Sequence, residues 1–104
     1  MIRLTVLYNL PEGTDEAEFL RWRLGEHQAD NAAMPGVIHT DFGRIDERWT
    51  FDNPKVKPPY RFMTIAEWPD RESFEAAFYA DSPDDDLSRM SDSVFLISEI
   101  LVST

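Results

Sequence analysis

Two histidines stand in different predicted elements, and they are the side chains best suited to acid or base chemistry near neutral pH. His27 lies on a helix predicted from about residue 15 to about residue 33. A step of about 100° per residue places it between Phe19 on one side and Leu20 and Leu24 on the other, at the centre of the apolar arc. An inward imidazole is costly to bury without a partner. This position therefore indicates either a hydrogen-bonded core histidine or a histidine that moves a proton.

His39 and Asp41 form a second candidate group, because residues two apart on a predicted strand share one face. A carboxylate there can raise the pKa of a neighbouring imidazole and orient the ring for proton transfer. The alternative is an ordinary solvated strand face. Glu26 directly precedes His27 but diverges from it by about 100° on a helix, so we expect it to face solvent. Trp22 lies on a different arc from His27, where it can cover the edge of a cavity or pack against another subunit.

Several kinds of site and partner are not expected. The sequence has no cysteine, which excludes disulfides, thiolate catalysis and cysteine-ligated metals and favours a cytoplasmic protein. The two histidines and Asp41 lie on different elements without a recognisable ligand spacing, so we expect no metal. The net charge of −10 disfavours nucleic acid and anionic membrane surfaces as partners. No stretch approaches the roughly 20 apolar residues of a membrane span.

Apolar periodicity predicts four strands and two helices in a single domain of 104 residues. In chain order they are a strand at 2–8, a helix at about 15–33, a strand at about 37–51, a strand at 60–68, a helix from about 69 to 81 and a strand at 93–102. This βαββαβ order predicts a ferredoxin-like α+β fold, in which both helices cover one face of a four-stranded antiparallel sheet. The last strand is almost continuously apolar, so we expect it to be buried on both faces. The uncovered sheet face predicts a homodimer.

Short motifs along most of the chain add a family to this outline. They are the segment 1–8 (MIRLTVLY), an aromatic residue about one turn before Glu26-His27, Met34-Pro35-Gly36, and the segment 61–70 (RFMTIAEWPD). In order and spacing they resemble the EthD family of dimeric α+β barrel proteins. The resemblance implies a barrel formed by two sheets at a dimer interface and a pocket between sheet and helices in each subunit. It also implies that His27 matches the family's helix histidine. Relatives in the wider superfamily include muconolactone-type isomerases, polyketide cyclases and cofactor-independent oxygenases.

The residues and the resemblance together predict a small enzyme without a cofactor. It would act on an apolar cyclic or aromatic metabolite, in degradation or in pigment or polyketide biosynthesis, by isomerisation, cyclisation or oxygenation. The expected catalytic residues are His27 and, as second candidates, His39 and Asp41, and the expected substrate-binding residues are Phe19, Trp22, Tyr60 and Phe62. The main alternative is a non-catalytic protein that shields or delivers a hydrophobic intermediate. A haem-handling protein, with His27 as an axial ligand, is the third interpretation.

Overall fold

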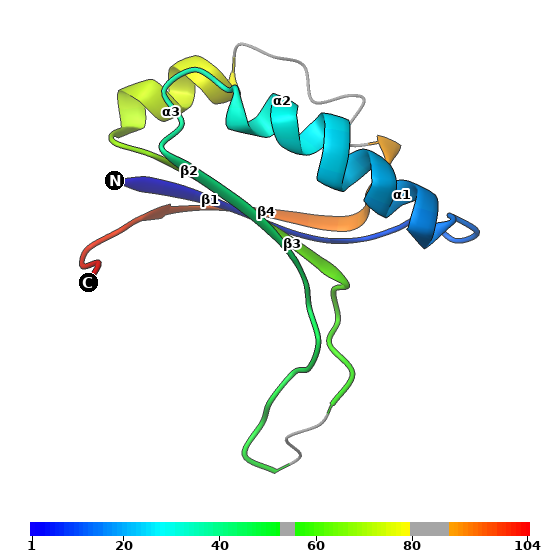
Figure 1. Cartoon of the computed structure of the whole chain (residues 1–104). Coiled ribbons are helices and arrows are strands. Elements are labelled where there is room, and N and C mark those ends of the chain that lie inside the picture. Colours follow the sequence, from blue (N-terminus) through cyan, green and yellow to red (C-terminus); the bar gives the residue numbers. More distant parts are fainter. Residues whose placement is uncertain (53–55, 80–87) are drawn as a thin grey trace.

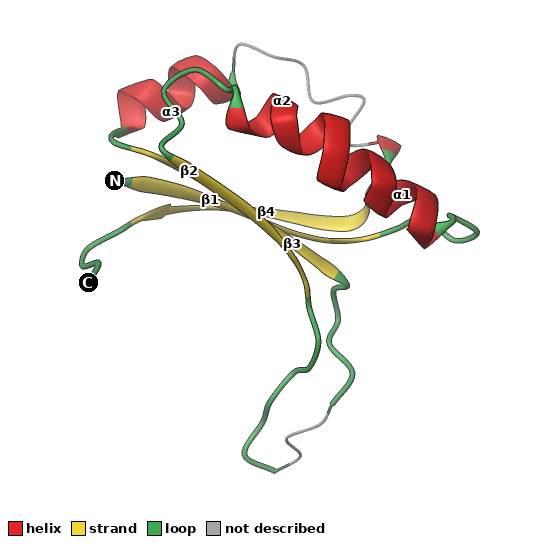
Figure 2. Ribbon diagram, viewed as in Figure 1, coloured by secondary structure: helices red, strands yellow, loops and turns green. Residues whose placement is uncertain are grey.

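The computed structural model describes residues 1–52, 56–79 and 88–104, and Figures 1 and 2 show one sheet with the helices on one of its faces. The strands are β1 (Ile2–Asn9), β2 (His39–Arg44), β3 (Phe62–Trp68) and β4 (Ser91–Glu99). They pair in the order β2-β3-β1-β4, and every pairing is antiparallel. The ferredoxin-like α+β fold predicted from the sequence is confirmed.

The helices cover the sheet as two separate pieces. A continuous helical run comprises α1 (Glu16–Trp22), a π turn η1 (Arg23–His27) and α2 (Gln28–Ala32), and the second piece is α3 (Arg71–Phe78). The predicted end of this second helix, near Asp81, lies outside the described residues. Among the described residues, no helix is long and apolar enough to cross a membrane.

The first helical run begins and ends at residues whose chemistry explains the boundary. Asp15 caps α1, because its side chain accepts hydrogen bonds from the backbone N–H groups of Ala17 and Glu18 at 3.0 and 3.3 Å. At the other end, Gly36 adopts a φ of +75°, a left-handed conformation that favours glycine. Next to it, the indole N–H of Trp68 donates to the carbonyl of Pro35 at 3.1 Å. The turn after the helix is therefore tied to the end of β3.

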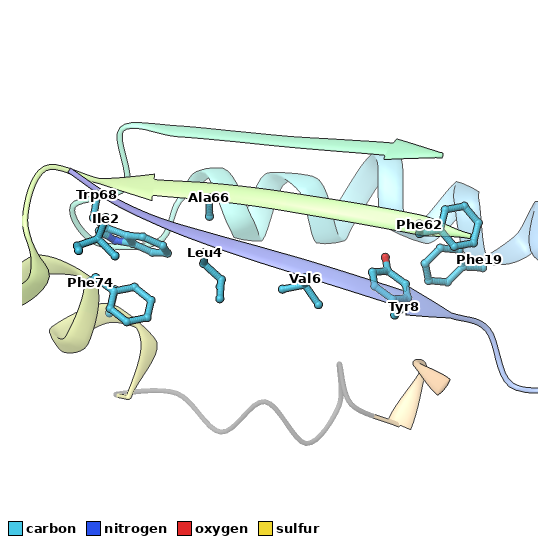
Figure 3. Packing of buried hydrophobic residues seen from close by; sticks show 10 residues of the cluster. Ile2, Leu4, Val6, Tyr8, Phe19, Phe62, Ala66, Trp68 and Phe74 are labelled. Carbon is cyan, nitrogen blue, oxygen red and sulfur yellow. The ribbon is translucent and has the colours of Figure 1, made fainter. Parts of the chain in front are cut away.

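The core lies between the sheet and the helices. Alternate residues of β1 point to the same side of the sheet (Figure 3), where β3 and the helices add the remaining buried side chains. The buried apolar residues are Ile2, Leu4, Val6, Tyr8, Phe19, Phe62, Ala66, Trp68, Phe74 and Ala77. Phe62, Trp68 and Phe74 are fully buried. Because successive strand residues point to opposite faces, the other face of the same strands is left to a different set of side chains.

The strand predicted at about 37–51 is too long. β2 ends at Arg44, and residues 45–52 and 56–61 form the described part of an arm that extends beyond the sheet, away from the helices (Figure 1). The backbone of Ile45 still donates to Arg61 at 2.8 Å, and an isolated bridge joins Arg48 to Val56 with bonds of 3.0 and 3.2 Å. Regular pairing stops because the charged segment 46–48 has no apolar face to pack against the sheet. The next strand begins at Phe62, two residues later than predicted.

Within a single chain, the last strand is not buried on both faces as expected. β4 lies at an edge of the sheet and pairs only with β1. Leu96 is 48% exposed and Ile97 is 40% exposed, although these neighbours point to opposite faces. The apolar run therefore does not mark a central strand within one chain.

Candidate functional site

A cavity of about 410 Å³ lies between the first helical run and the sheet. Its lining from the sheet consists of Leu4, Val6, Tyr8, Thr64, Ala66 and Phe95. The helical run and the turn after it contribute Phe19, Trp22, Arg23, Glu26, His27, Asp30, Asn31 and Met34, and the rest of the wall is Ala77, Phe78, Arg89 and Met90. The volume falls in the range of about 300–1,000 Å³ that is usual for small-molecule sites. An apolar floor with a few polar groups on one wall suits a small organic ligand.

His27 lines this cavity, half-buried, and its ring stacks on that of Trp22. The two ring centroids are 4.3 Å apart and the planes are inclined by 21°. The sequence predicted that these residues occupy different arcs of the helix, and this is wrong. Residues five apart are separated by about 140° on an α-helix. The π turn η1 closes i to i+5 instead and so brings residue 27 back over residue 22.

Arg23 occupies the buried helix position that the apolar arc had assigned to Leu24. Arg23 is 1% exposed, whereas Leu24 is 61% exposed. The guanidinium donates to Gln28 Oε1 at 2.7 Å and to Thr64 Oγ1 at 3.2 Å. Its carbon also lies 4.2 Å from the centroid of the Phe42 ring. Sequence reasoning missed this residue, although a spacing of four from Phe19 places both on one helix face and could have revealed it.

The buried guanidinium belongs to a polar chain that crosses from the helical run to two strands. Gln28 accepts a hydrogen bond from Arg23 and donates one from Nε2 to Thr40 Oγ1 at 3.0 Å. Thr64 Oγ1 accepts a hydrogen bond from the other guanidinium nitrogen of Arg23. Hydrogen bonds of this kind compensate the cost of burying a charge. These hydrogen bonds therefore fix the C-terminal side of the π turn relative to β2 and β3. They also fix the cavity wall that carries His27.

Arg89 reaches the cavity from the segment before β4. Its guanidinium carbon lies 4.0 Å from the centroid of the Trp22 ring, so Trp22 contacts both Arg89 and His27. Sequence analysis did not identify this residue, because it lies outside every predicted helix and strand. The lining thus contains two arginines, Arg23 and Arg89, and two acidic residues, Glu26 and Asp30. In a chain with a net charge of −10, this wall is locally far less acidic than the protein as a whole.

His39 and Asp41 do share a strand face, as predicted, and His39 Nε2 lies 3.0 Å from Asp41 Oδ2. In the β2–β3 register they stand opposite Glu67 and Ile65. That face is the one turned away from the helices, since the alternate residues of β2 pack towards the core. Both side chains are about half exposed. The structure therefore does not bring them to the cavity that His27 lines.

The four aromatic residues predicted to bind substrate divide into two pairs. Phe19 and Trp22 line the cavity. Phe62 is fully buried behind it, with its ring centroid 5.2 Å from that of Phe19, and Tyr60 precedes β3 outside the lining. Contact of Tyr60 or Phe62 with a substrate stays a prediction. Among the described residues, no group of three or more histidine, aspartate or glutamate side chains is arranged to hold a metal ion.

Comparison with known proteins identifies relatives by structure. No protein-family model and no curated protein matches the sequence. An EthD family protein from Bacillus halodurans superposes with a TM-score of 0.78 at 23% identity, over 97% of this chain and 99% of that one. A dimeric ferredoxin-like protein from Thermobifida fusca gives a TM-score of 0.64 at 17% identity, over 95% and 90%. SnoaB from Streptomyces nogalater, a cofactor-independent oxygenase, gives a TM-score of 0.66 at 19% identity, over 98% and 94%. The resemblance to EthD family proteins is confirmed for the fold.

Proposed function

We propose that this protein is a small enzyme that holds a planar, mostly apolar ring compound in the cavity and uses His27 to move a proton. The observation that carries the proposal is the stack of His27 on Trp22 at the cavity wall, with ring centroids 4.3 Å apart. The stack fixes the orientation of the imidazole ring at the cavity wall. A ring in this setting can accept a proton from a bound substrate and return it.

The chemistry that follows depends on the anion left after proton removal. Return of the proton at another carbon is an isomerisation, and attack of the anion within the molecule is a cyclisation. A sufficiently electron-rich carbanion can instead react with O₂, so that a CH₂ group and O₂ yield C=O and water. This last route needs no cofactor. The fold shared with the cofactor-independent oxygenase SnoaB favours it.

A homodimer is the second part of the proposal. The sheet face away from the helices carries Leu7, Met63, Ile65, Val94 and Leu96. Apolar side chains on one face of an open sheet favour an isologous contact with the same face of a second copy. The dimeric ferredoxin-like protein from Thermobifida fusca supports this arrangement. Residues 1–104 then form one domain per subunit.

Anthrone is a suitable first probe, because its acidic CH₂ group lies in a three-ring apolar skeleton and O₂ converts it to anthraquinone and water. We expect the wild-type protein to accelerate O₂ uptake and anthraquinone formation. His27→Ala should lower this rate by about 10²–10⁴-fold, the usual contribution of a positioned acid or base. The pH–rate profile of the wild type should contain a limb that the variant lacks.

His39→Ala provides the matched comparison, because it removes the other histidine from the opposite sheet face. Equal thermal unfolding of both variants would exclude a folding defect. Loss of activity in His39→Ala together with full activity in His27→Ala would overturn the assignment. Tight binding of anthrone with no turnover by the wild type would favour the non-catalytic binding protein instead.

A further inference from the structure

Arg89 is exposed and differs both from the buried Arg23, which donates to Gln28 and Thr64, and from the arginines that pair with carboxylates. Arg3, Arg61 and Arg71 each pair with a carboxylate, at N to O distances of 3.0, 2.9 and 3.2 Å. Arg89 instead lies against the ring of Trp22, with 4.0 Å between its guanidinium carbon and the ring centroid. Within residues 1–52, 56–79 and 88–104, no carboxylate lies within ion-pair distance of it. Among the described residues, the contact recorded for this cation at the cavity is thus the aromatic face of Trp22.

Stacking of this kind leaves the hydrogen-bonding edge of the guanidinium available. The aromatic ring occupies a face of the planar group, whereas all five N–H donors lie in its plane. Arg89 as a whole residue is exposed. Two parallel N–H bonds from such an edge match the two oxygens of a carboxylate. Arg89 can therefore donate two parallel hydrogen bonds to a planar anion.

The surroundings of Arg89 indicate what the anion would be attached to. Trp22 joins Arg89 to the apolar part of the cavity, where Phe95 and Met90 also line the wall. The two carboxylates of the lining, Glu26 and Asp30, would repel a second anion near them. A ligand with one charged end therefore gains by placing that end at Arg89 and its ring system over the apolar floor.

We propose that the cavity takes a planar ring compound that carries a carboxylate, and that Arg89 binds this carboxylate through the edge of its guanidinium. The inference rests on the proposed function, because it treats the same cavity as the substrate site. It adds the chemical class of the ligand and assigns Arg89 to recognition, separately from the proton transfer assigned to His27.

The test compares two ligands with one skeleton, 1-naphthoate and the neutral 1-naphthamide, by calorimetric titration of the wild-type protein. We expect the carboxylate to bind about tenfold or more tightly than the amide, because hydrogen bonds between charged partners exceed neutral ones. The preference should weaken as salt is raised, since the Arg89 site is open to solvent. Equal affinities for the two ligands, or binding of neither, would overturn the inference.

Substitutions test whether Arg89 is the residue that causes the preference for the carboxylate over the amide. Arg89→Gln should abolish it, and Arg89→Lys should retain only part of it, because a lysine keeps the charge without the planar fork. Arg21→Gln is the matched control: it removes the same charge from an exposed residue of α1 that does not line the cavity. We expect Arg21→Gln to keep the full preference. Equal losses in Arg89→Gln and Arg21→Gln would show a general charge effect and contradict a carboxylate site at Arg89.

The two proposals fail in different ways. The proposed function is tested by His27-dependent oxidation of anthrone, which has no carboxylate. The ligand class is tested by the difference in affinity between naphthoate and naphthamide. Anthrone turnover by a wild-type protein that binds both naphthalene compounds equally would overturn the ligand class alone.

Discussion

The two faces of the sheet are built from the same strands but differ in how far their side chains are buried. On the covered face, Phe62 and Trp68 are fully buried beneath the helices and the cavity opens beside them. On the other face, Met63 and Ile65, their neighbours in β3, are only half-buried. Most apolar residues of the covered face are therefore buried within one chain, although Ile97 there is 40% exposed. The apolar residues of the other face are only partly buried, which is the observation behind the proposed homodimer.

The largest expected effect tests whether the covered face carries the stability. Phe62→Ala empties a fully buried site and should lower the free energy of unfolding by about 3–5 kcal/mol. Met63→Ala, one residue along the same strand, should cost at most about half as much, because less of its surface leaves water on folding. Urea unfolding at one protein concentration measures both. Equal costs would show that the two faces are equally important to the fold.

The next largest expected effect concerns the proposed dimer contact on the sheet face that is turned away from the helices. Leu96→Glu places a charge on that face and should weaken the dimer on the order of 10²-fold, since burial of an unpaired charge costs several kcal/mol. Ile97→Glu is the control, because Ile97 is similarly exposed and points to the helix side. Sedimentation over a range of concentrations separates the two outcomes. Dissociation by Ile97→Glu but not by Leu96→Glu would place the interface elsewhere.

The smallest expected effect concerns the polar rim of the covered face, where Glu16 at the start of α1 pairs with Arg61, the last residue of the arm. Arg61 donates two hydrogen bonds to Glu16, at 2.9 and 3.2 Å. These bonds, together with the charges of Arg61 and Arg44, lower the pKa of the Glu16 carboxyl below its ordinary value of 4.5, against the opposing effect of burial. The stabilisation is therefore fully present above pH 4.5 and is lost as the pH falls through the folded-state pKa.

Glu16→Gln tests this rim at two pH values. Because the pair is exposed and screened by solvent, the variant should be less stable than the wild type by only about 0.2–1 kcal/mol at pH 7. The difference should shrink as the pH falls towards the lowered pKa of the Glu16 carboxyl, because protonation removes the charge that the variant also lacks. Urea unfolding at pH 7 and pH 3 measures the change, with Glu12→Gln in the preceding turn as the control. A difference that persists at pH 3 would assign the effect to packing rather than charge.

The features predicted from the sequence are those that depend on local pattern. Apolar patterning predicted the strands that became β1 and β3 in their order along the chain, and it placed the start of the first helix near residue 15, where Asp15 caps α1. Burial of Arg23 was not predicted, because a charged residue on an apolar face is assigned to solvent unless its partners are known. Those partners, Gln28 and Thr64, are brought together only by the tertiary fold. The exposure of β4 was missed because apolar composition does not distinguish burial within a chain from burial between chains.

The position of His27 also depends on something that no single side chain encodes. The helical run is anchored at one end by Phe19 in the core and at the other by Gln28 on Thr40, and the π turn fits between these anchors. A π turn holds one residue more than an α-helix of the same length would. The meeting of His27 with Trp22 is therefore a matter of residue count. A substitution between the anchors keeps this count, whereas insertion or deletion of one residue there should reorient the imidazole relative to Trp22.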